Sequence, residues 1–262
     1  MSRTLLAIES STDWLSVALL KGEDVLVFEE HEASRQHASA LLPTIDRVLG
    51  QAGLGLDALE AIGIATGPGS FTSLRIGLAT VKGLTLGREI PAVGVSTLEA
   101  MAFSVFLGLE EGSPEVSEAG EVVALLDARR GEWYGGGWLR PAESDGLPIA
   151  TLPEGLYGSD RLLEDLSREA VVMSPETPGW RRVCDRSDVD TGRIIEGRAA
   201  RPRADSVGRL AARRMARGEA ISVAQLEARY LRRAEAEAKR LGTPVEEGEL
   251  VRLGQTREAG ST

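Results

Sequence analysis

Residues 3–13 of this 262-residue chain read Arg-Thr-Leu-Leu-Ala-Ile-Glu-Ser-Ser-Thr-Asp, an apolar run that ends in an acid and a polar turn. The apolar run is typical of a buried strand. Residues 121–127 have the same form, because they end in Asp127 before the turn Ala128-Arg129-Arg130-Gly131. Backbone N–H groups in such turns can bind phosphate, and the acid can hold a metal-bound water. We therefore expect two related α/β halves with a cleft between them.

The residues after each of these strands predict one order of elements twice. Apolar spacing in each half indicates three strands, then a helix, a strand and a helix. In the first half the strands are predicted at 3–9, 14–20, 25–31, 61–66 and 91–95, and the helices at 36–52, 71–87 and from Ser96, which forms a capping box with Glu99. In the second half the strands are predicted at 121–127, 132–139, 147–152 and 169–174, and the helices at 159–166 and 205–217, with Asp205 as a cap.

Residues 108–120 separate the two halves, because they are acidic and rich in Gly, Ser and Pro, a composition typical of a linker. We expect an N-terminal lobe at 1–107 and a C-terminal lobe at 121–241 that carries a basic helical segment. The polar, Gly-rich residues 242–262 are expected to form a mobile tail. Each lobe is predicted to hold a mixed sheet with helices.

The composition limits the chemistry that the chain can perform. One Cys and two His exclude a disulfide framework, a thiolate zinc cluster and a three-His site. His31-Glu32 resembles the start of a zincin motif, but position 35 is Arg, and His31 and His37 are not spaced for one helical face. Cys184 has no base beside it in the sequence, and no Gly-x-Ser-x-Gly motif is present. We predict no metal ligands and no catalytic nucleophile.

The net charge of −10 is unevenly distributed along the chain. Residues 193–240 carry 13 basic and 6 acidic side chains, a balance of +7, so the remainder carries −17. A basic segment on an acidic body favours an anionic partner, although arginine-rich, solvated helix faces explain the same pattern without one. No apolar run approaches the length of a membrane span, and the N-terminus lacks the pattern of a signal peptide, so we expect a cytoplasmic protein.

The most unusual segment is 67–77, which reads Gly-Pro-Gly-Ser-Phe-Thr-Ser-Leu-Arg-Ile-Gly. Its glycines allow a tight turn, and Ser70 is a natural N-cap for the helix that follows. The helix N-terminus could bind an anion, or the turn could serve only close packing. It is not a P-loop, because no Gly-Lys-Ser/Thr follows. The candidate phosphate-binding turns together comprise Glu9, Ser10, Ser11, Thr12, Gly67, Gly69, Ser70 and Asp127.

Several motifs resemble the TsaB (YeaZ) family. They are Leu6-Ala7-Ile8-Glu9-Ser10-Ser11-Thr12, the whole 67–77 segment, Gly94-Val95-Ser96-Thr97-Leu98, residues 123–132 and the late Tyr230-Leu231-Arg232. The match is strong over 1–104, fair at 121–134 and thin from 140 to 225. Ser73 stands where the family commonly has Gly, Arg229 replaces a smaller or apolar residue, and the residues beyond 242 are extra.

The resemblance implies the two-lobed actin/Hsp70-like fold, a duplicated ribonuclease H-like unit. It also implies a non-catalytic scaffold of the cytoplasmic bacterial machinery that makes N6-threonylcarbamoyladenosine at the tRNA adenosine next to the anticodon. The implied partners are the catalytic paralogue TsaD, the ATPase TsaE, tRNA through the complex, and a second copy of the chain. No cofactor is implied, and a nucleotide at a subunit junction stays open.

The resemblance further implies that pairing uses the predicted helices at 36–52 and 71–87. Their apolar stripes either cover the chain's own sheet or form this interface. The residues expected at the interface are His37, Leu41, Leu42, Ile45, Leu74, Arg75, Leu78 and Val81. Two alternatives remain: an ATP-dependent phosphotransferase that uses Glu9, Asp127 and the Gly67–Ser70 turn, and a metallopeptidase.

Overall fold

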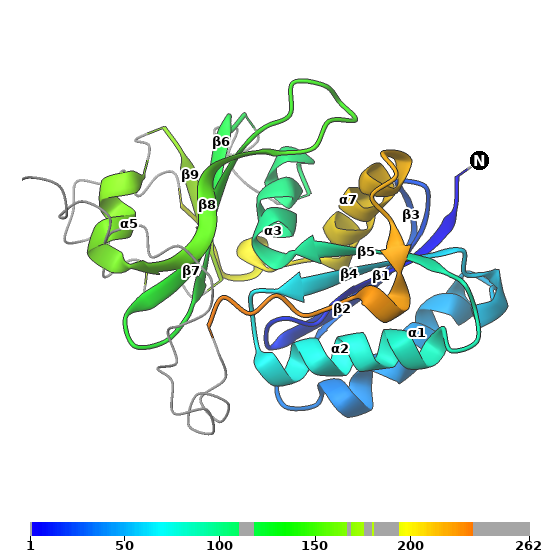
Figure 1. The fold of residues 1–262 in the computed structure, drawn as a ribbon. Helices are drawn as coiled ribbons and strands as arrows, with labels where there is room; N and C mark the ends of the chain where they lie inside the picture. The colour runs from blue at the N-terminus through cyan, green and yellow to red at the C-terminus, as the bar shows by residue number, and fades with distance from the viewer. Residues whose placement is uncertain (1, 110–117, 167–168, 176–179, 181–193, 233–262) are drawn as a thin grey trace, which may run out of the picture.

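The computed structural model describes residues 2–109, 118–166, 169–175, 180 and 194–232, which form two lobes, each built on one mixed sheet (Figure 1). The strands of the first sheet are β1 (Thr4–Glu9), β2 (Trp14–Lys21), β3 (Asp24–Glu32), β4 (Ala61–Gly67), β5 (Pro91–Ser96) and β11 (Ile221–Ser222). The strands of the second sheet are β6 (Glu121–Asp127), β7 (Glu132–Leu139), β8 (Ile149–Gly158), β9 (Val171–Ser174) and β10 (Ile194–Glu196).

Apart from β11 at the edge of the first sheet, the two sheets share one strand order. The first sheet runs β11-β5-β4-β1-β2-β3, and the second runs β10-β9-β6-β7-β8. In each sheet the first three strands pair antiparallel, and the fourth and fifth add in parallel on the other side of the first. This repeated order confirms the predicted two-lobed, actin/Hsp70-like α/β fold.

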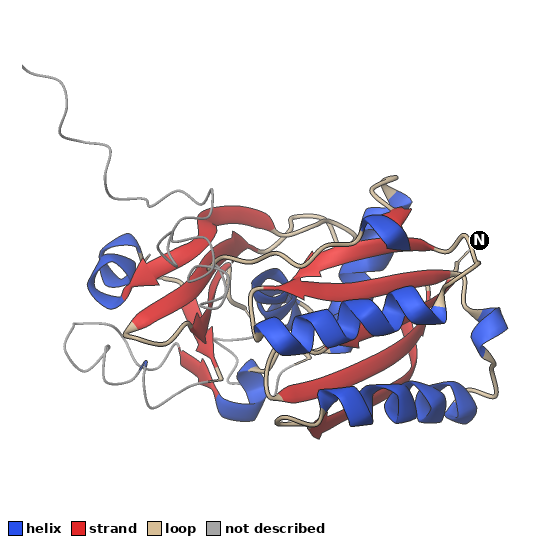
Figure 2. Ribbon diagram, turned by 60° about the horizontal axis from the view of Figure 1, so that its bottom comes forward, coloured by secondary structure: helices blue, strands red, loops and turns tan. Residues whose placement is uncertain are grey.

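Helices cover both faces of the first sheet (Figure 2). One face carries α1 (His37–Gln51) and α2 (Phe71–Leu84), and the other carries α3 (Thr97–Phe106) and α7 (Ala204–Ala216). Because side chains alternate along a strand, Leu6 and Ile8 of β1 face the first helix pair, and Leu5 and Ala7 face the second. The second sheet carries α5 (Ser159–Asp165), and three short 3₁₀ helices complete the described elements: η1 (Leu56–Ala58), η3 (Gly197–Ala200) and η4 (Val223–Gln225).

One apolar core joins the two lobes. All ten residues of α3 are buried, because this helix packs against both sheets and against α7. Phe103 of α3 belongs to the same buried cluster as Ala7 of the first sheet, Val122 of the second sheet and Leu210 of α7. The lobes therefore share apolar packing in addition to the linker between them.

The structure corrects the expected C-terminal lobe of 121–241. Helix α7 packs on β1, β2 and β4, and β11 pairs antiparallel with β5, so both belong to the first sheet. The backbone N–H of Ala204 at the start of α7 donates to the Ser16 hydroxyl of β2 over 2.9 Å. An apolar stripe on a helix fits any sheet face, so its spacing could not show which lobe α7 covers.

The predicted caps have different outcomes. Ser70 is the N-cap of α2, as predicted, and accepts from the backbone N–H of Ser73. Ser96 caps α3, but the other half of the predicted box is absent, because the Glu99 carboxylate binds Arg214 instead of the backbone. Asp205 is not a cap: Arg203 is the N-cap residue of α7, and Asp205 lies inside the helix with its carboxylate on the Arg203 side chain.

Some predictions lie outside the described residues. These are Cys184, most of the 108–120 linker and the tail at 242–262. Strand β8 is longer than the predicted 147–152 and ends at Gly158, whereas α2 is shorter than predicted and ends at Leu84. None of the helices in the described part of the chain has the length and apolar character needed to cross a membrane.

Candidate functional site

The predicted turns meet at a cleft of about 230 Å³ between the lobes. The first lobe lines it with Ser11, Thr12 and Asp13 after β1, and with Gly69 and Ser70 before α2. The second lobe lines it with Leu126, Asp127, Ala128 and Arg129, together with Tyr134 of β7. The structure therefore brings together five of the eight predicted phosphate-turn residues: Ser11, Thr12, Gly69, Ser70 and Asp127.

The two turns of the first lobe are packed tightly against each other. The backbone N–H of Ser70 donates to the carbonyl oxygen of Ser11 over 2.6 Å. A side chain at Gly69 would collide with that same carbonyl group, so only glycine permits this approach. The structure therefore supports the interpretation that the glycines of the 67–77 segment serve close packing.

Glu9 and Ser10 lie beneath this wall and do not line the cleft. Glu9 is fully buried, and its Oε1 accepts from the backbone N–H of Ser11 over 2.5 Å. Burial in an apolar environment raises the pKa of Glu9 to about 7. The Ser10 hydroxyl donates to the carbonyl oxygen of Ser73. Both side chains therefore hold the first turn in place from inside the lobe.

The wall from the second lobe is more exposed. Asp127 accepts from the backbone N–H of Arg129 over 2.7 Å and from its guanidinium over 3.2 Å. Arg129 and Arg130 both adopt positive φ angles, 68° and 60°. Among the described residues that line the cleft, Arg129 is the sole basic side chain, and Asp127 and Asp13 are the acidic ones. The cleft is therefore polar but poorly suited to a highly charged anion.

Most of the expected interface residues are buried inside the chain. His37, Leu41, Ile45, Leu74, Leu78 and Val81 pack beneath α1 and α2, whereas Leu42 is 51% exposed and Arg75 is exposed. This corrects the expectation that the eight side chains form one outer surface. The stripe spacing identified the inner faces of both helices, because covering a sheet and covering a partner require the same periodicity.

His37 is a buried residue, not a surface one. It is the first residue of α1, and its Nδ1 lies 3.5 Å from the hydroxyl of Ser73 in α2. Burial lowers the pKa of His37. The Ser73 hydroxyl also bonds to the Ser70 hydroxyl over 3.0 Å, so the serine at this position closes a polar contact between the two helices. His31 lies in β3, and the described residues contain no group of three or more His, Cys, Asp or Glu side chains suited to a metal ion.

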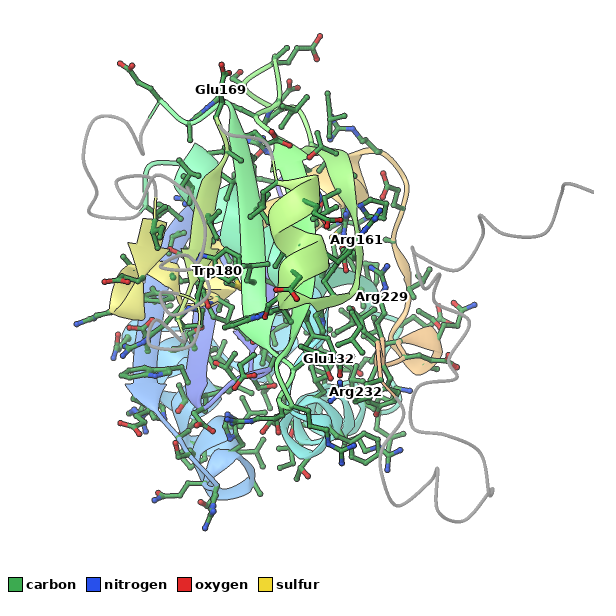
Figure 3. The ribbon with its side chains drawn as sticks, turned by 90° about the vertical axis from the view of Figure 1, so that its left-hand side faces the viewer. Glu132, Arg161, Glu169, Trp180, Arg229 and Arg232 are labelled. Atoms are coloured by element: carbon green, nitrogen blue, oxygen red, sulfur yellow. The ribbon has the colours of Figure 1, made fainter. Side chains whose placement is uncertain are left out.

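The arginines of the basic segment form ion pairs and hydrogen bonds within the chain, which the sequence did not reveal. Every arginine described between 198 and 232 has a polar partner in the chain. Arg214 binds both carboxylate oxygens of buried Glu99, over 2.8 Å and 2.6 Å. Arg229 and Arg232 reach the second lobe, where Figure 3 shows Arg232 next to Glu132. The described arginines of this segment therefore all have partners within the chain, although Arg198 and Arg229 remain 82% and 48% exposed.

Comparisons with known proteins identify the relatives of this chain. Residues 30–142 match the family model described as TsaD: tRNA N6-adenosine threonylcarbamoyltransferase. A protein of Haemophilus influenzae named tRNA threonylcarbamoyladenosine biosynthesis protein TsaB is 42% identical over 132 residues, 50% of this chain and 52% of that protein. A protein of the same name from Buchnera aphidicola subsp. Acyrthosiphon pisum is 31% identical over 189 residues, 72% of this chain and 77% of that protein.

Solved structures agree with the sequence matches. The structure described as YeaZ from Pseudomonas aeruginosa superposes with a TM-score of 0.70 at 29% identity, covering 87% of this chain and 100% of that one. Coverage differs among the curated relatives, since this chain spans about half the length of the Haemophilus influenzae and Escherichia coli proteins.

Proposed function

This chain belongs to the TsaB family, also called YeaZ, and from that premise we propose that it is a non-catalytic scaffold subunit for the formation of N6-threonylcarbamoyladenosine in tRNA. The observation that carries the proposal is the match to relatives named tRNA threonylcarbamoyladenosine biosynthesis protein, one of them over 77% of its length. The match of residues 30–142 to the threonylcarbamoyltransferase family supports kinship with the catalytic paralogue.

The cleft supports a scaffold better than an enzyme. Its volume of about 230 Å³ is below the range of roughly 300–1,000 Å³ that is usual for ligand pockets. Glu9 is buried beneath the first turn, and Asp127 is engaged by the backbone and side chain of Arg129. Glu9 is therefore not presented to a substrate, and Asp127, which lines the cleft, is already bonded to Arg129.

The scaffold acts in the cytoplasm by pairing, through α1 and α2, with a TsaD-like catalytic subunit or with a second copy of this chain. The surface available for pairing is the outer side of these helices, which includes Ala38 and Leu42 of α1 and Thr72, Arg75 and Ala79 of α2, all exposed. The small side chains allow another helix to approach closely. Pairing stabilises the active arrangement of the partner by differential contact. A TsaE-like ATPase and tRNA join through the assembled complex.

Reconstitution tests the proposal directly. The catalytic subunit, the TsaE-like ATPase and a tRNA substrate are assayed with and without this chain, and modified adenosine is quantified by mass spectrometry. We expect this chain to co-purify with the catalytic subunit and to be required for full activity. Undiminished activity without it would contradict the scaffold function.

The alternative, a phosphotransferase of the same fold, rests on the meeting of the two predicted turns at the cleft. Calorimetric titration of the purified chain with ATP and magnesium separates the two functions. We expect no tight binding and no turnover. Tight binding with ATP consumption would instead assign the cleft to phosphoryl transfer.

A further inference from the structure

The segment that follows η4 runs from the first lobe to the second (orange in Figure 1). We call residues 226–232 the strap. Leu226, at its start, is buried in the core beneath α2, and Leu231, near its end, is also buried. The strap is therefore anchored by apolar packing at both ends, and its polar groups lie between these anchors.

The strap binds the first lobe behind the wall of the cleft. The backbone N–H of Arg229 donates to the carbonyl oxygen of Thr66 in β4 over 2.7 Å. Gly67 has a φ of 118°, and a Cβ there would lie 2.6 Å from the Arg229 carbonyl oxygen, so glycine is needed for this contact. The Tyr230 hydroxyl accepts from Nε of Arg75 in α2 over 3.0 Å. The strap is thus fixed to both elements that flank the 67–70 turn.

Three residues later, the strap binds the turn that forms the opposite wall. The Arg232 guanidinium donates to the carbonyl oxygen of Ala128, a residue that lines the cleft, over 2.6 Å, and it also pairs with Glu132 at the start of β7. The Arg229 guanidinium pairs with Glu154 of β8 over 2.8 Å. Each pair has one largely buried side chain, Glu154 at 11% and Arg232 at 13% exposed, whereas Arg229 is 48% and Glu132 is 33% exposed.

These contacts connect the two walls of the cleft by a very short piece of chain. Three residues span at most about 11 Å even when fully extended. From these distances we propose that the strap is a clasp that sets the width of the cleft by holding the 67–70 turn and the 127–132 turn at a fixed separation. Release of the Arg229 and Arg232 ion pairs lets the two turns move apart.

Spin labels on the two lobes test the clasp in the full-length protein. The chain's single cysteine is removed as Cys184→Ser, and labels are attached at Asp57→Cys in η1 and Asp160→Cys in α5, both exposed. Pulsed EPR then compares the parent with the double variant Arg229→Gln/Arg232→Gln. We expect the variant to show a longer mean distance and a broader distribution than the parent.

The matched control is Arg47→Gln, which breaks an ion pair with Glu29 inside the first lobe. It is expected to leave the distance distribution unchanged. Hydrogen exchange gives a second measurement: the backbone amides of Ser11–Asp13 and Asp127–Arg129 should exchange roughly tenfold faster in the double variant than in the control. A folded double variant with the parent's distance distribution and exchange rates would overturn the clasp.

A second variant decides the question if the arginine substitutions prevent folding. Glu132→Gln/Glu154→Gln keeps the size of both partners and removes their charges. It should shift the distance distribution in the same direction by a smaller amount. The parent's distribution in this folded variant would equally contradict the proposal.

Discussion

The two lobes repeat one strand order, but the acids that end their leading strands lie in opposite environments. In the first lobe the acid at the end of the leading strand, Glu9, is fully buried, and the Glu99–Arg214 pair is largely removed from solvent. In the second lobe the equivalent acid, Asp127, pairs with Arg129, whose side chain is 81% exposed. Helices cover both faces of the first sheet, whereas the turn of the second lobe stands in solvent. The same topology therefore carries a buried acid in one lobe and an exposed ion pair in the other.

The largest predicted effect concerns the buried pair of the first lobe. Arg214→Ala leaves the Glu99 carboxylate buried without its partner, which costs about 3–5 kcal/mol of unfolding free energy near pH 8. The matched change in the second lobe, Arg129→Ala, should cost at most about 0.5 kcal/mol, because its pair is exposed. Urea denaturation of both variants measures the difference. Equal losses would show that the two lobes do not differ in this way.

The next effect separates the two sides of α1. Leu41→Ala removes a side chain from the core and should cost about 2–5 kcal/mol of unfolding free energy. Its neighbour Leu42 is exposed, so Leu42→Ala should stay within about 0.5 kcal/mol of the parent. Thermal and urea denaturation compare the pair. A large loss for Leu42→Ala would mean that the outer side of α1 is also covered.

The buried acid of the first lobe predicts a pH dependence. The pKa of Glu9 is raised from 4.5 to about 7, so between these values the folded protein holds a proton that the unfolded chain has released. This group therefore makes folding less favourable as pH rises from about 4.5 to 7, by roughly 3 kcal/mol in all. Glu9→Gln should remove that slope, and urea denaturation across this range measures it.

Glu60 supplies a control of opposite sign for this pH dependence. Its bonds to the Thr4 backbone and to Lys21 lower its pKa to about 2, so its contribution is present above pH 4.5 and is lost on acidification. Glu60→Gln should therefore reduce the stability lost below pH 4.5 and leave the slope at higher pH intact. A Glu9→Gln profile parallel to the parent's would refute the buried-acid assignment.

The smallest effect on stability, yet a complete effect on pairing, is expected for Leu42→Asp. The side chain is exposed, so the fold is retained to within about 0.5 kcal/mol, while a charge in the proposed α1–α2 interface opposes association. Leu139→Asp, at a 40% exposed leucine of the second lobe, is the control. Size-exclusion chromatography and co-purification with the catalytic subunit measure pairing. Undiminished pairing of Leu42→Asp would exclude this surface.

Several features could be predicted because they depend on neighbours in the sequence. The turn after β1, the Ser70 cap and the order of strands follow from apolar runs, glycines and capping residues a few positions apart. The positions of α7 and β11 could not be predicted in this way. Their partners lie more than a hundred residues earlier in the chain, and an apolar stripe does not specify which sheet it covers.

The features of the candidate site also separate into those that the sequence predicted and those that only the structure showed. Motifs identified the turns that line the cleft, but burial determined that Glu9 and Ser10 lie beneath it. Helical periodicity predicted that Leu41, Leu78 and Val81 pack against an apolar surface. The structure shows that this surface is the chain's own sheet. The composition of the basic segment revealed only its charge, whereas its contacts with the second lobe depend on the positions of Glu132 and Glu154.

By itself the sequence determined the family, the duplicated α/β order and the identity of the turns that face the cleft. These properties are local, because strand, turn and cap propensities act over a few residues. Only the tertiary structure decided which side chains are core, which are surface and which charges are paired. Burial and ion pairing depend on segments that meet in space, so Arg214 and Glu99, 115 residues apart, form one interaction only when α7 packs against α3.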